Sequence, residues 1–539
     1  MFKRITAAVL CLGILFSFSA CGRNEPKNAN RKINYYLAAE PKTLDPQIAS
    51  DSSAMIAIEA LFEGLVRLGS DNRPYPGVAE KWISSEDDTV FTFTLRSNAK
   101  WSDDKKTPVT ANDFVYAFRR ALLPQTESET CSRMFCIKNA KEVNSGKVSA
   151  DQLGVTAADA HTLVVRLNYS YPDFPSITAA TVFMPCNQKF FESTSGRYGL
   201  ERKYLLGNGP FEIDGKYGWD HGQYLNLVRS DTYLGNQKPL PSNIKFTIET
   251  KDNVISDPVA ALKADTVDAI AVSGDQAASA KAQGCTITSF EDTTWGLCFN
   301  TQSDMMKNKN IRRAFIQSFN RAAVLKHLPK NVSPANDIIT PMTTLMGKPY
   351  RSLANSGSFF LKQDKNAAAL LAAGLSELSL SELKSVSVIC PDNADVKLML
   401  NEMIATWNVQ FKNYFNMEPL DSGKLAARIK SGDYQIALCP VQPAGDGPLS
   451  VLSLFKSGEK DNPAKLQDSS FDTMLNNAEK SDGTGSAAIF ASAEKYLNEQ
   501  GVFYPLYYEK HYYAAAKGVT GVVFHPYSAG VDFIQSGKD

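Results

Sequence analysis

The chain has 539 residues, with 57 basic and 57 acidic side chains, so its formal net charge is zero. A neutral chain offers no overall positive field, which argues against a nucleic-acid-binding role. The length exceeds what one hydrophobic core supports and predicts about two to four domains.

The first 20 residues read as an export signal. Lys3 and Arg4 form a short positive region, and an almost wholly apolar run at residues 7–20 follows. This run is short for a permanent membrane-spanning helix and fits the core of a signal peptide. No later segment is long and apolar enough to cross a bilayer. We therefore expect residues 1–20 to be removed and the rest to be exported.

The residues around Cys21 sharpen this expectation. Ser19-Ala20-Cys21 resembles the lipobox of bacterial lipoproteins, in which the cysteine is lipidated, although Phe18 stands where leucine is usual. The resemblance implies that Cys21 is a lipid attachment site; the alternative is an ordinary signal peptide with an incidental cysteine. Residues 21–32 are then the anchor and a polar tether, which hold the protein at the cell membrane on its extracytoplasmic face.

The next clear patterns are a strand and a helix. Residues 88–96 alternate apolar and polar side chains, which predicts a half-buried strand. Thr110 and Asp113 have the spacing of a helix-capping pair, and apolar residues recur at helical spacing after them. The pattern predicts a helix over 112–122, which ends before Pro124.

A second helix is predicted to begin near Asn310, with one apolar stripe from Ile311 to Leu325 and with Arg312, Arg313 and Arg321 facing elsewhere. Further strands are predicted at 161–167, 224–229, 244–248, 386–390 and 434–438, and further helices at 364–374, 396–414 and 486–500. This mixed order indicates α/β lobes.

The cysteines after Cys21 are odd in number and contain no CxxC pair. Their spacing, with only five scattered histidines, does not indicate a zinc site, so we expect no metal. Buried free thiols are the expectation, because free cysteine packs as a small apolar side chain. Cys131 and Cys136 are the one local pair near enough to be bridged, and the sequence leaves this open.

Several short motifs follow one another in a fixed order. They are EPKTLDP at 40–46, LFEGL at 61–65, PGVAEKW at 76–82, FTFTLR at 91–96, AKWSD at 99–103, VTANDFVYAFRR at 109–120, GNGPF at 207–211 and IRRAF at 311–315. In this order they resemble the oligopeptide- and dipeptide-binding proteins of ABC importers, over nearly the whole exported chain.

Most of these motifs also have a structural explanation. Asp45 can accept hydrogen bonds from local backbone amides in a turn. Trp82 and Trp101 suit core packing. Gly207 and Gly209 suit a bend whose φ values other residues resist. These residues therefore identify the scaffold and not the ligand.

The resemblance implies an α/β fold, a two-lobed clamp like that of periplasmic binding proteins, with an additional domain inserted in the first lobe. By position, lobe one comprises 33–67, 199–295 and 510–539, the inserted domain 68–198, and lobe two 296–509. The implied function is that of a substrate-binding component, which captures peptides or peptide-like solutes and delivers them to the permease subunits of an ABC importer. We expect a monomer without a cofactor.

Family members bind the ligand's free amino group with an Asp in a segment resembling Trp-x-x-Asp-Tyr-x-x-Pro. The matching stretch here is LCPVQPAGDGP, from Leu438 to Pro448, and Ala444 stands at the Asp position. The usual amine partner is absent in this alignment. Asp446 is the remaining carboxylate of the loop; it either replaces the missing partner or is a solvated turn residue.

Other candidate ligand-binding residues match ligand-facing positions of the family. They are Ser50, Asp51, Ser52, Thr130, Asp421, Ser422, Tyr508 and Glu509. The tyrosine-rich run at 504–513 could stack on a ligand, although such alternation more often reflects strand packing.

Two other functions remain open from the sequence. An exported hydrolase would need a nucleophile or metal motif, and the chain contains no GxSxG, HExxH or GxxxxGK[ST] sequence. We therefore expect no catalytic residues. A peptide-sensing or chaperone surface lipoprotein could use the same scaffold, because function resides in the site and not in the fold.

Overall fold

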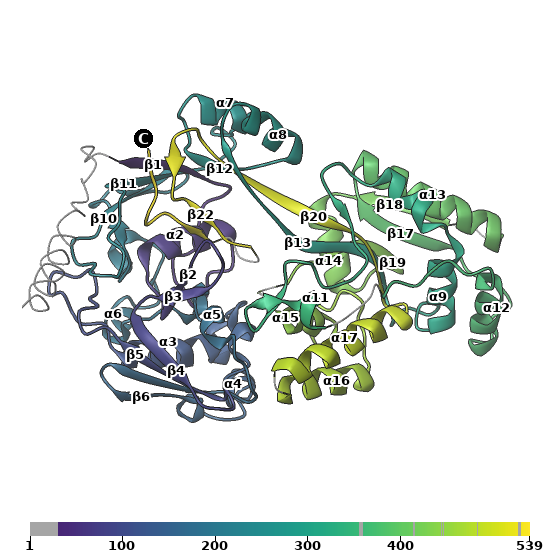
Figure 1. Ribbon diagram of the computed structural model, residues 1–539, viewed down its shortest axis with the longest axis horizontal. Helices are drawn as coiled ribbons and strands as arrows, with labels where there is room; N and C mark the ends of the chain where they lie inside the picture. Colours follow the sequence, from purple (N-terminus) through teal and green to yellow (C-terminus); the bar gives the residue numbers. More distant parts are fainter. Residues whose placement is uncertain are drawn as a thin grey trace, which may run out of the picture.

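The computed structural model describes residues 31–354, 359–412, 415–443, 445, 447–481, 483–526 and 530–538. The predicted signal peptide, Cys21 and Asp446 lie outside these residues. The chain forms two lobes (Figure 1). One hydrophobic core is built from buried residues between 33 and 290 and between 514 and 533, and defines the first lobe. The second lobe has two cores, with residues between 297 and 507.

One large mixed sheet extends through both lobes. Its strand order is β18-β17-β19-β13-β20-β12-β1-β11-β10-β8, with β14 beside β20 and β9 beside β10. The strands are β1 (Lys32–Leu37), β8 (Phe211–Ile213), β9 (Trp219–Asp220), β10 (Tyr224–Arg229), β11 (Asn243–Ile248), β12 (Ala269–Val272), β13 (Thr286–Phe299), β14 (Ser333–Pro334), β17 (Val386–Pro391), β18 (Phe415–Leu420), β19 (Ile436–Val441) and β20 (Phe503–Ala515).

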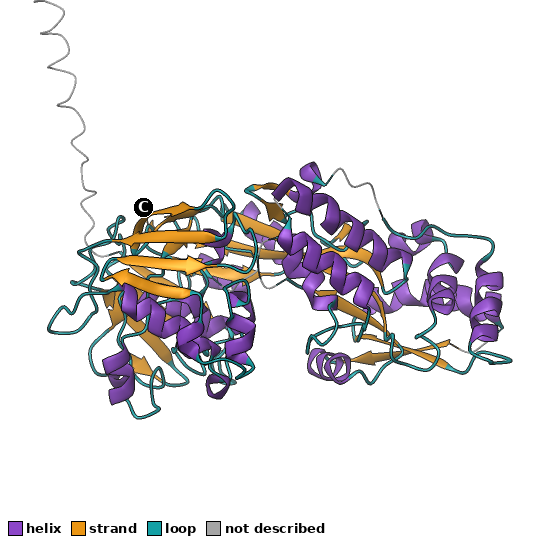
Figure 2. Ribbon diagram, turned by 90° about the horizontal axis from the view of Figure 1, so that it is seen from below, coloured by secondary structure: helices purple, strands orange, loops and turns teal. Residues whose placement is uncertain are grey.

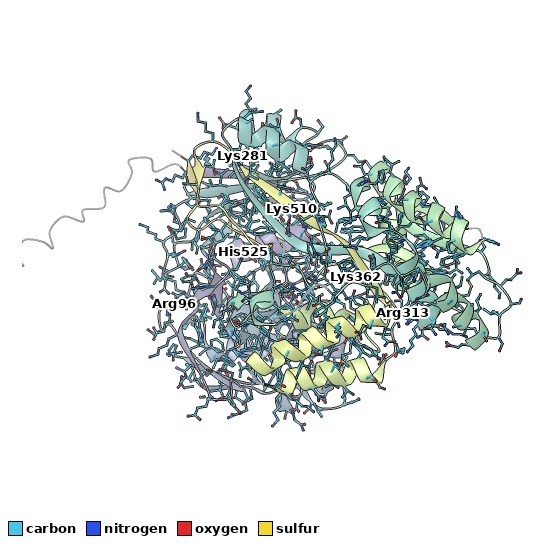
Figure 3. The ribbon with its side chains drawn as sticks, turned by 45° about the vertical axis from the view of Figure 1, so that its right-hand side comes forward. Arg96, Lys281, Arg313, Lys362, Lys510 and His525 are labelled. Carbon is cyan, nitrogen blue, oxygen red and sulfur yellow. The ribbon has the colours of Figure 1, made fainter. Side chains whose placement is uncertain are left out.

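The long antiparallel strands β13 and β20 connect the lobes (Figure 1). Their pairing shifts register between Phe290 and Thr293 and again between Trp295 and Gly296. Such bulges bend a strand and interrupt its ladder. Beside the first bulge, Lys510 Nζ lies 2.9 Å from Glu291 Oε1, and Figure 3 labels Lys510 on this ribbon. The interlobe connection is therefore a paired ribbon with a local weak point.

A separate antiparallel sheet lies within the stretch predicted to be the inserted domain. Its strand order is β4 (Ala79–Ser84), β5 (Val90–Leu95), β7 (Thr162–Arg166) and β6 (Val155–Asp159). The predicted alternation is confirmed, because Phe91, Phe93 and Leu95 are buried. Helix α3 (Ala111–Leu122) begins with the predicted capping box of Thr110 and Asp113.

Buried ion pairs join motifs that are far apart in the sequence. Arg120 at the end of α3 donates to both carboxylate oxygens of Asp45, at 2.8 and 2.5 Å. Asp45 also accepts from the backbone amide of Gln47, as the turn prediction required. A second buried pair joins Glu63 to Arg96. The family motifs thus fix the inserted sheet to the body of the first lobe.

The two glycines of the GNGPF motif are not required for the predicted reason, which was an unusual φ value. Neither Gly207 nor Gly209 has positive φ. A Cβ on Gly207 would lie 2.3 Å from the carbonyl oxygen of Leu61, and one on Gly209 would lie 2.5 Å from the backbone nitrogen of Phe62. Close approach to the end of α2 (Ser52–Leu61) therefore requires glycine at both positions.

The helix predicted from Asn310 is interrupted. Helix α9 (Lys309–Ser318) ends at Ser318. Asn320 then caps the short helix α10 (Arg321–Val324), because its side chain accepts hydrogen bonds from two backbone amides. Arg312 does not face solvent: it is buried and donates to the carbonyl oxygens of Met306 and Gln500. A capping side chain thus divides what reads as one apolar stripe.

Helices cover the sheets of both lobes (Figure 2). Those not yet given are α4 (Ala140–Asn144), α5 (Phe174–Ile177), α6 (Gln188–Ser193), α7 (Pro258–Lys263), α8 (Gly274–Ala282), α11 (Tyr350–Leu353), α12 (Ala367–Glu377), α13 (Ala394–Phe411), α14 (Ser422–Ser431), α15 (Pro448–Leu452), α16 (Ser469–Lys480) and α17 (Gly483–Glu499). The short strand pairs are β2 (Val66–Leu68) with β3 (Pro74–Pro76), β15 (Thr344–Leu345) with β16 (Lys348–Pro349), β21 (Val519–Thr520) with β24 (Gly537–Lys538), and β22 (Val523–Phe524) with β23 (Val531–Asp532).

The cysteines of the described residues are free thiols, including Cys131 and Cys136, so the possible bridge between these two is not formed. All are buried except Cys285, which is half-buried. Within the described ranges, no group of His, Cys, Asp and Glu side chains is arranged to hold a metal ion. No helix in the same ranges combines the length and apolar character that a membrane span requires.

Candidate functional site

A large cavity lies between the two lobes. Its volume is about 1900 Å³, compared with the ~300–1,000 Å³ of pockets for drug-sized ligands. It is lined by residues 50–82, 124–184, 342–347, 430–479 and 525–532, although not by every residue of these ranges. In Figure 1, α4 and α5 of the first lobe lie opposite α15 and α16 of the second. The cavity has room for a ligand longer than a single amino acid.

The first lobe contributes ionisable groups to the cavity wall. Arg67 donates from Nε and Nη2 to Asp532 Oδ2, at 3.3 and 2.9 Å. Glu59, on α2, lies near this pair. Burial, followed by the repulsion of Asp532, raises the pKa of Glu59 to about 8. Its carboxyl group is therefore largely protonated at neutral pH.

The C-terminal segment of the first lobe adds His525, which Figure 3 labels, to the same wall. Burial lowers the pKa of His525, so its imidazole is neutral at neutral pH.

The segment predicted to be the inserted domain supplies the inserted wall of the cavity, between Pro124 and Thr181. Thr130 and Arg133 lie at the short 3₁₀ helix Cys131–Met134, and both face the cavity. Tyr169 and Tyr171 add aromatic surface. The thiol of Cys136 also lines the cavity, and burial raises its pKa to about 12, so it is a poor nucleophile.

The second lobe closes the cavity with the segment that follows β19. Gly445, Leu449 and Ser450 lie at the start of α15, and Ser450 Oγ donates to the carbonyl oxygen of Gly445 at 2.6 Å. A charged rim is formed by Lys430, from α14 before β19, and by residues further along the chain: Lys456, Glu459, Lys460, Asp461 and Glu479. This wall is therefore polar at its edge and partly apolar near α15.

The lobes also touch directly at one edge of the cavity. The backbone amide of Met346, in the turn between β15 and β16, donates to Asp173 Oδ2 at 2.5 Å. Asp173 belongs to the first lobe and immediately precedes α5. This contact connects the second lobe to the first at a point remote in sequence from the ribbon of β13 and β20.

Two of the predicted ligand-binding residues line the cavity. Ser50 is exposed at its first-lobe wall, and Thr130 lies at its inserted wall. Their roles in ligand binding stay predictions. Asp446 lies outside the described residues, while Gly445 beside it does line the cavity.

Four other candidates lie at helix starts and not among the lining residues. Asp51 caps α2 by accepting from the amide of Ala54 at 2.8 Å, and Ser52 begins that helix. Asp421 caps α14 in the same way, and exposed Ser422 follows it. The helix ends already occupy both carboxylates, and a ligand role for these four residues stays a prediction.

Tyr508 and Glu509 lie on β20, at the interlobe ribbon. The Tyr508 hydroxyl donates to the carbonyl oxygen of Asp337 at 3.2 Å. Glu509 Oε2 accepts from Trp295 Nε1 at 2.6 Å. Within the tyrosine-rich run, Tyr504, Tyr507 and Tyr508 are buried, which is strand packing. These groups connect β20 to its neighbours in this conformation.

Comparison with known proteins identifies the family of this chain. The family described as bacterial extracellular solute-binding proteins, family 5 Middle, matches residues 73–463. The chain belongs to this family. The dipeptide-binding protein DppE of Bacillus subtilis is 26% identical over 538 residues, covering 97% of each chain. The periplasmic murein peptide-binding protein MppA of Escherichia coli is 28% identical over 488 residues, covering 88% of this chain and 86% of MppA.

The solved structures agree with the fold of this family 5 protein. The substrate-binding domain of an oligopeptide ABC transporter from Bacillus anthracis is 25% identical, with a TM-score of 0.74 over 95% of this chain and 99% of that one. The prediction of a two-lobed α/β clamp is confirmed. The relatives named here are binding proteins of extracytoplasmic or periplasmic type and not enzymes.

Sequence reasoning missed the charged residues of the first-lobe wall. Glu59 carries a signal that could have been used, since it is the one charged residue of helix SSAMIAIEAL and lies in its apolar part. Arg133 and Asp532 carry none, because they lie in loops or short elements and meet the cavity only through the fold.

Proposed function

We propose that this family 5 protein is the substrate-binding component of an ABC importer, which captures peptides or peptide-like solutes between closing lobes. The observation that carries the proposal is the interlobe cavity of about 1900 Å³, which has ionisable groups on both walls. A peptide has charged ends and many polar backbone groups, and each of these needs a partner when water is excluded. The names of the relatives as dipeptide- and peptide-binding proteins support the same ligand class.

The finer parts of the proposal concern the chain's attachment and assembly. Cys21 carries the lipid, residues 1–20 are removed as a signal peptide, and the protein is held at the cell membrane beside the permease that receives its ligand. The protein acts as a monomer. Its domains are 33–67, 199–295 and 510–539 for lobe one, 68–198 for the inserted domain, and 296–509 for lobe two.

Recognition of the ligand's amino group needs a replacement carboxylate in this chain. Ala444 stands where the family has an Asp, and Asp446 is two residues further along the same loop. Its neighbour Gly445 lines the cavity, which supports the proposal. We propose Asp446 as the amine partner.

The test is mass spectrometry of small molecules that remain bound after native purification of a Cys21→Ser protein lacking residues 1–20. Asp446→Ala is compared with Asp304→Ala, because Asp304 is an exposed carboxylate of the second lobe outside the cavity lining. We expect peptides in the parent and in Asp304→Ala, and their loss from Asp446→Ala. Peptides retained by all three proteins would remove the role of Asp446.

The function itself is tested by small-angle X-ray scattering of the same parent protein. Addition of a peptide pool should reduce the radius of gyration, since the lobes close on the ligand. A protein that retains no peptide and does not compact with any pool would contradict the proposed function.

A further inference from the structure

Among the described residues, the inserted wall of the cavity contains polar groups without a hydrogen-bond partner. Arg133 lines the cavity, and within the described ranges its guanidinium donates no hydrogen bond and forms no ion pair. The hydroxyl oxygens of Ser128 and Thr130, in the same short segment, are shielded from solvent and have no hydrogen-bond partner in those ranges. Buried polar groups are usually paired in proteins, so the unpaired groups of this segment make it a candidate for ligand contact.

The neighbouring charges of the first-lobe wall do not neutralise Arg133. Arg67 is held by Asp532, at 2.9 Å, and these two opposite charges balance each other. Glu59 interacts electrostatically with Asp532, Arg67 and Arg133, and its carboxyl group remains protonated at neutral pH. Arg133 therefore carries a positive charge that no carboxylate of the described residues pairs. A guanidinium keeps its charge under these conditions, and Arg133 is half-buried at the cavity wall.

We propose that Arg133 binds a carboxylate of the captured ligand and makes the cavity selective for ligands that carry an acidic group at the inserted-domain end. The planar guanidinium fork matches a carboxylate with two parallel hydrogen bonds. The ligand carboxylate supplies the partner that the Arg133 guanidinium lacks within the described ranges. This inference rests on the proposed function, since it specifies which peptides the same cavity prefers.

The test measures the dissociation constants of short synthetic peptides by isothermal titration calorimetry at pH 7. The peptides are Ala-Glu-Ala, Ala-Gln-Ala and Ala-Lys-Ala, each with a free and with an amidated C-terminus. Charge-assisted hydrogen bonds predict at least a tenfold preference of the wild-type protein for the form that carries the recognised carboxylate. Loss of affinity on Glu-to-Gln exchange assigns the site to a side chain, and loss on amidation assigns it to the C-terminus.

The variants separate charge recognition from stability. Arg133→Gln should reduce the preference to less than about twofold, while Arg202→Gln, which removes an exposed arginine outside the cavity, should keep it. Circular dichroism checks that Arg133→Gln is folded, and Arg133→Lys should retain part of the preference as an independent variant.

Equal affinity of the wild-type protein for all forms, or an undiminished preference in Arg133→Gln, would overturn this inference and leave the proposed function intact. Failure of every peptide to bind would overturn both.

A pH series gives a second readout on the same wall. Glu59 ionises as the pH rises from 7 to 9, and its negative charge then competes with the ligand for Arg133. The preference for the acidic peptide should fall in this range in the wild-type protein and stay constant in Glu59→Gln. The other charged groups facing Glu59 are Asp532, Arg67 and Arg133, which keep their charges in this range, and the imidazole of His525 on the same wall stays neutral. A fall of the same size in Glu59→Gln would contradict the assignment.

Discussion

Removing Asp45 should leave a buried guanidinium without its carboxylate. Asp45 and Arg120 form a two-bond ion pair at 2.8 and 2.5 Å, and their side chains are only 3% and 7% exposed. Loss of one partner from a buried pair costs about 3–5 kcal/mol. In Asp45→Ala, Arg120 keeps the Gln47 side-chain oxygen and the ring of Phe191, 4.3 Å away. We therefore expect a loss at the lower end of this range, about 3 kcal/mol of the free energy of unfolding.

Urea unfolding followed by tryptophan fluorescence measures this loss, with circular dichroism as a second probe of whether the lobes unfold together. The double variant Asp45→Ala/Arg120→Met removes both charges, so its cost should be clearly below the sum of the single costs. Lys203→Met breaks the exposed pair with Glu201 and should leave the midpoint unchanged, since exposed pairs add little. A loss below about 1 kcal/mol in Asp45→Ala, or additive costs in the double variant, would refute the reasoning.

Three further outcomes are expected. Gly207→Ala should sharply reduce the yield of folded protein, because its Cβ would meet the Leu61 carbonyl, whereas Gly423→Ala meets only an ordinary contact and should keep the wild-type melting temperature. Because the pKa of Glu59 is higher in the folded than in the unfolded protein, wild-type stability should fall as the pH rises from about 4.5 to 8. Glu59→Gln should lack this fall and be a few kcal/mol more stable than the wild type at pH 8 in chemical denaturation. Parallel curves of stability against pH for the two proteins would contradict this expectation. Asp173→Ala removes the acceptor for the Met346 amide, so the unliganded protein should show a larger radius of gyration by X-ray scattering; an unchanged radius would show that the contact does not hold the lobes together.

Local patterns predicted elements well where local forces decide them. Strand β5 was predicted from the alternation at 88–96, and the start of α3 from the Thr110–Asp113 capping pair. Both signals are local, because the pleat of a strand and the cap of a helix involve only a few neighbouring residues. The helix from Asn310 was predicted too long. Apolar spacing alone does not reveal that Asn320 turns its side chain back onto the amides of the next helix.

The site was less predictable because its chemistry comes from long-range packing. Thr130 was predicted from its match to a ligand-facing position of the family, and it does line the cavity. Asp51 and Asp421 came from the same reasoning, yet helix ends engage both carboxylates. Glu59 and Arg133 are 74 positions apart in the printed sequence. Nothing local indicates that the fold places them near each other at the cavity, or that Arg133 lacks a partner among the described residues.

The order of strands in the large sheet has a consequence for how an exported chain matures. β12 pairs with β1 on one side and with β20 on the other, and β20 is followed by the segment that supplies Asp532. A chain that emerges N-terminus first therefore presents β12 with an open edge until more than two hundred further residues have crossed. An open strand edge is a template for wrong pairing. Early interruption of translocation would thus yield an aggregation-prone fragment and not a shortened but functional binding protein.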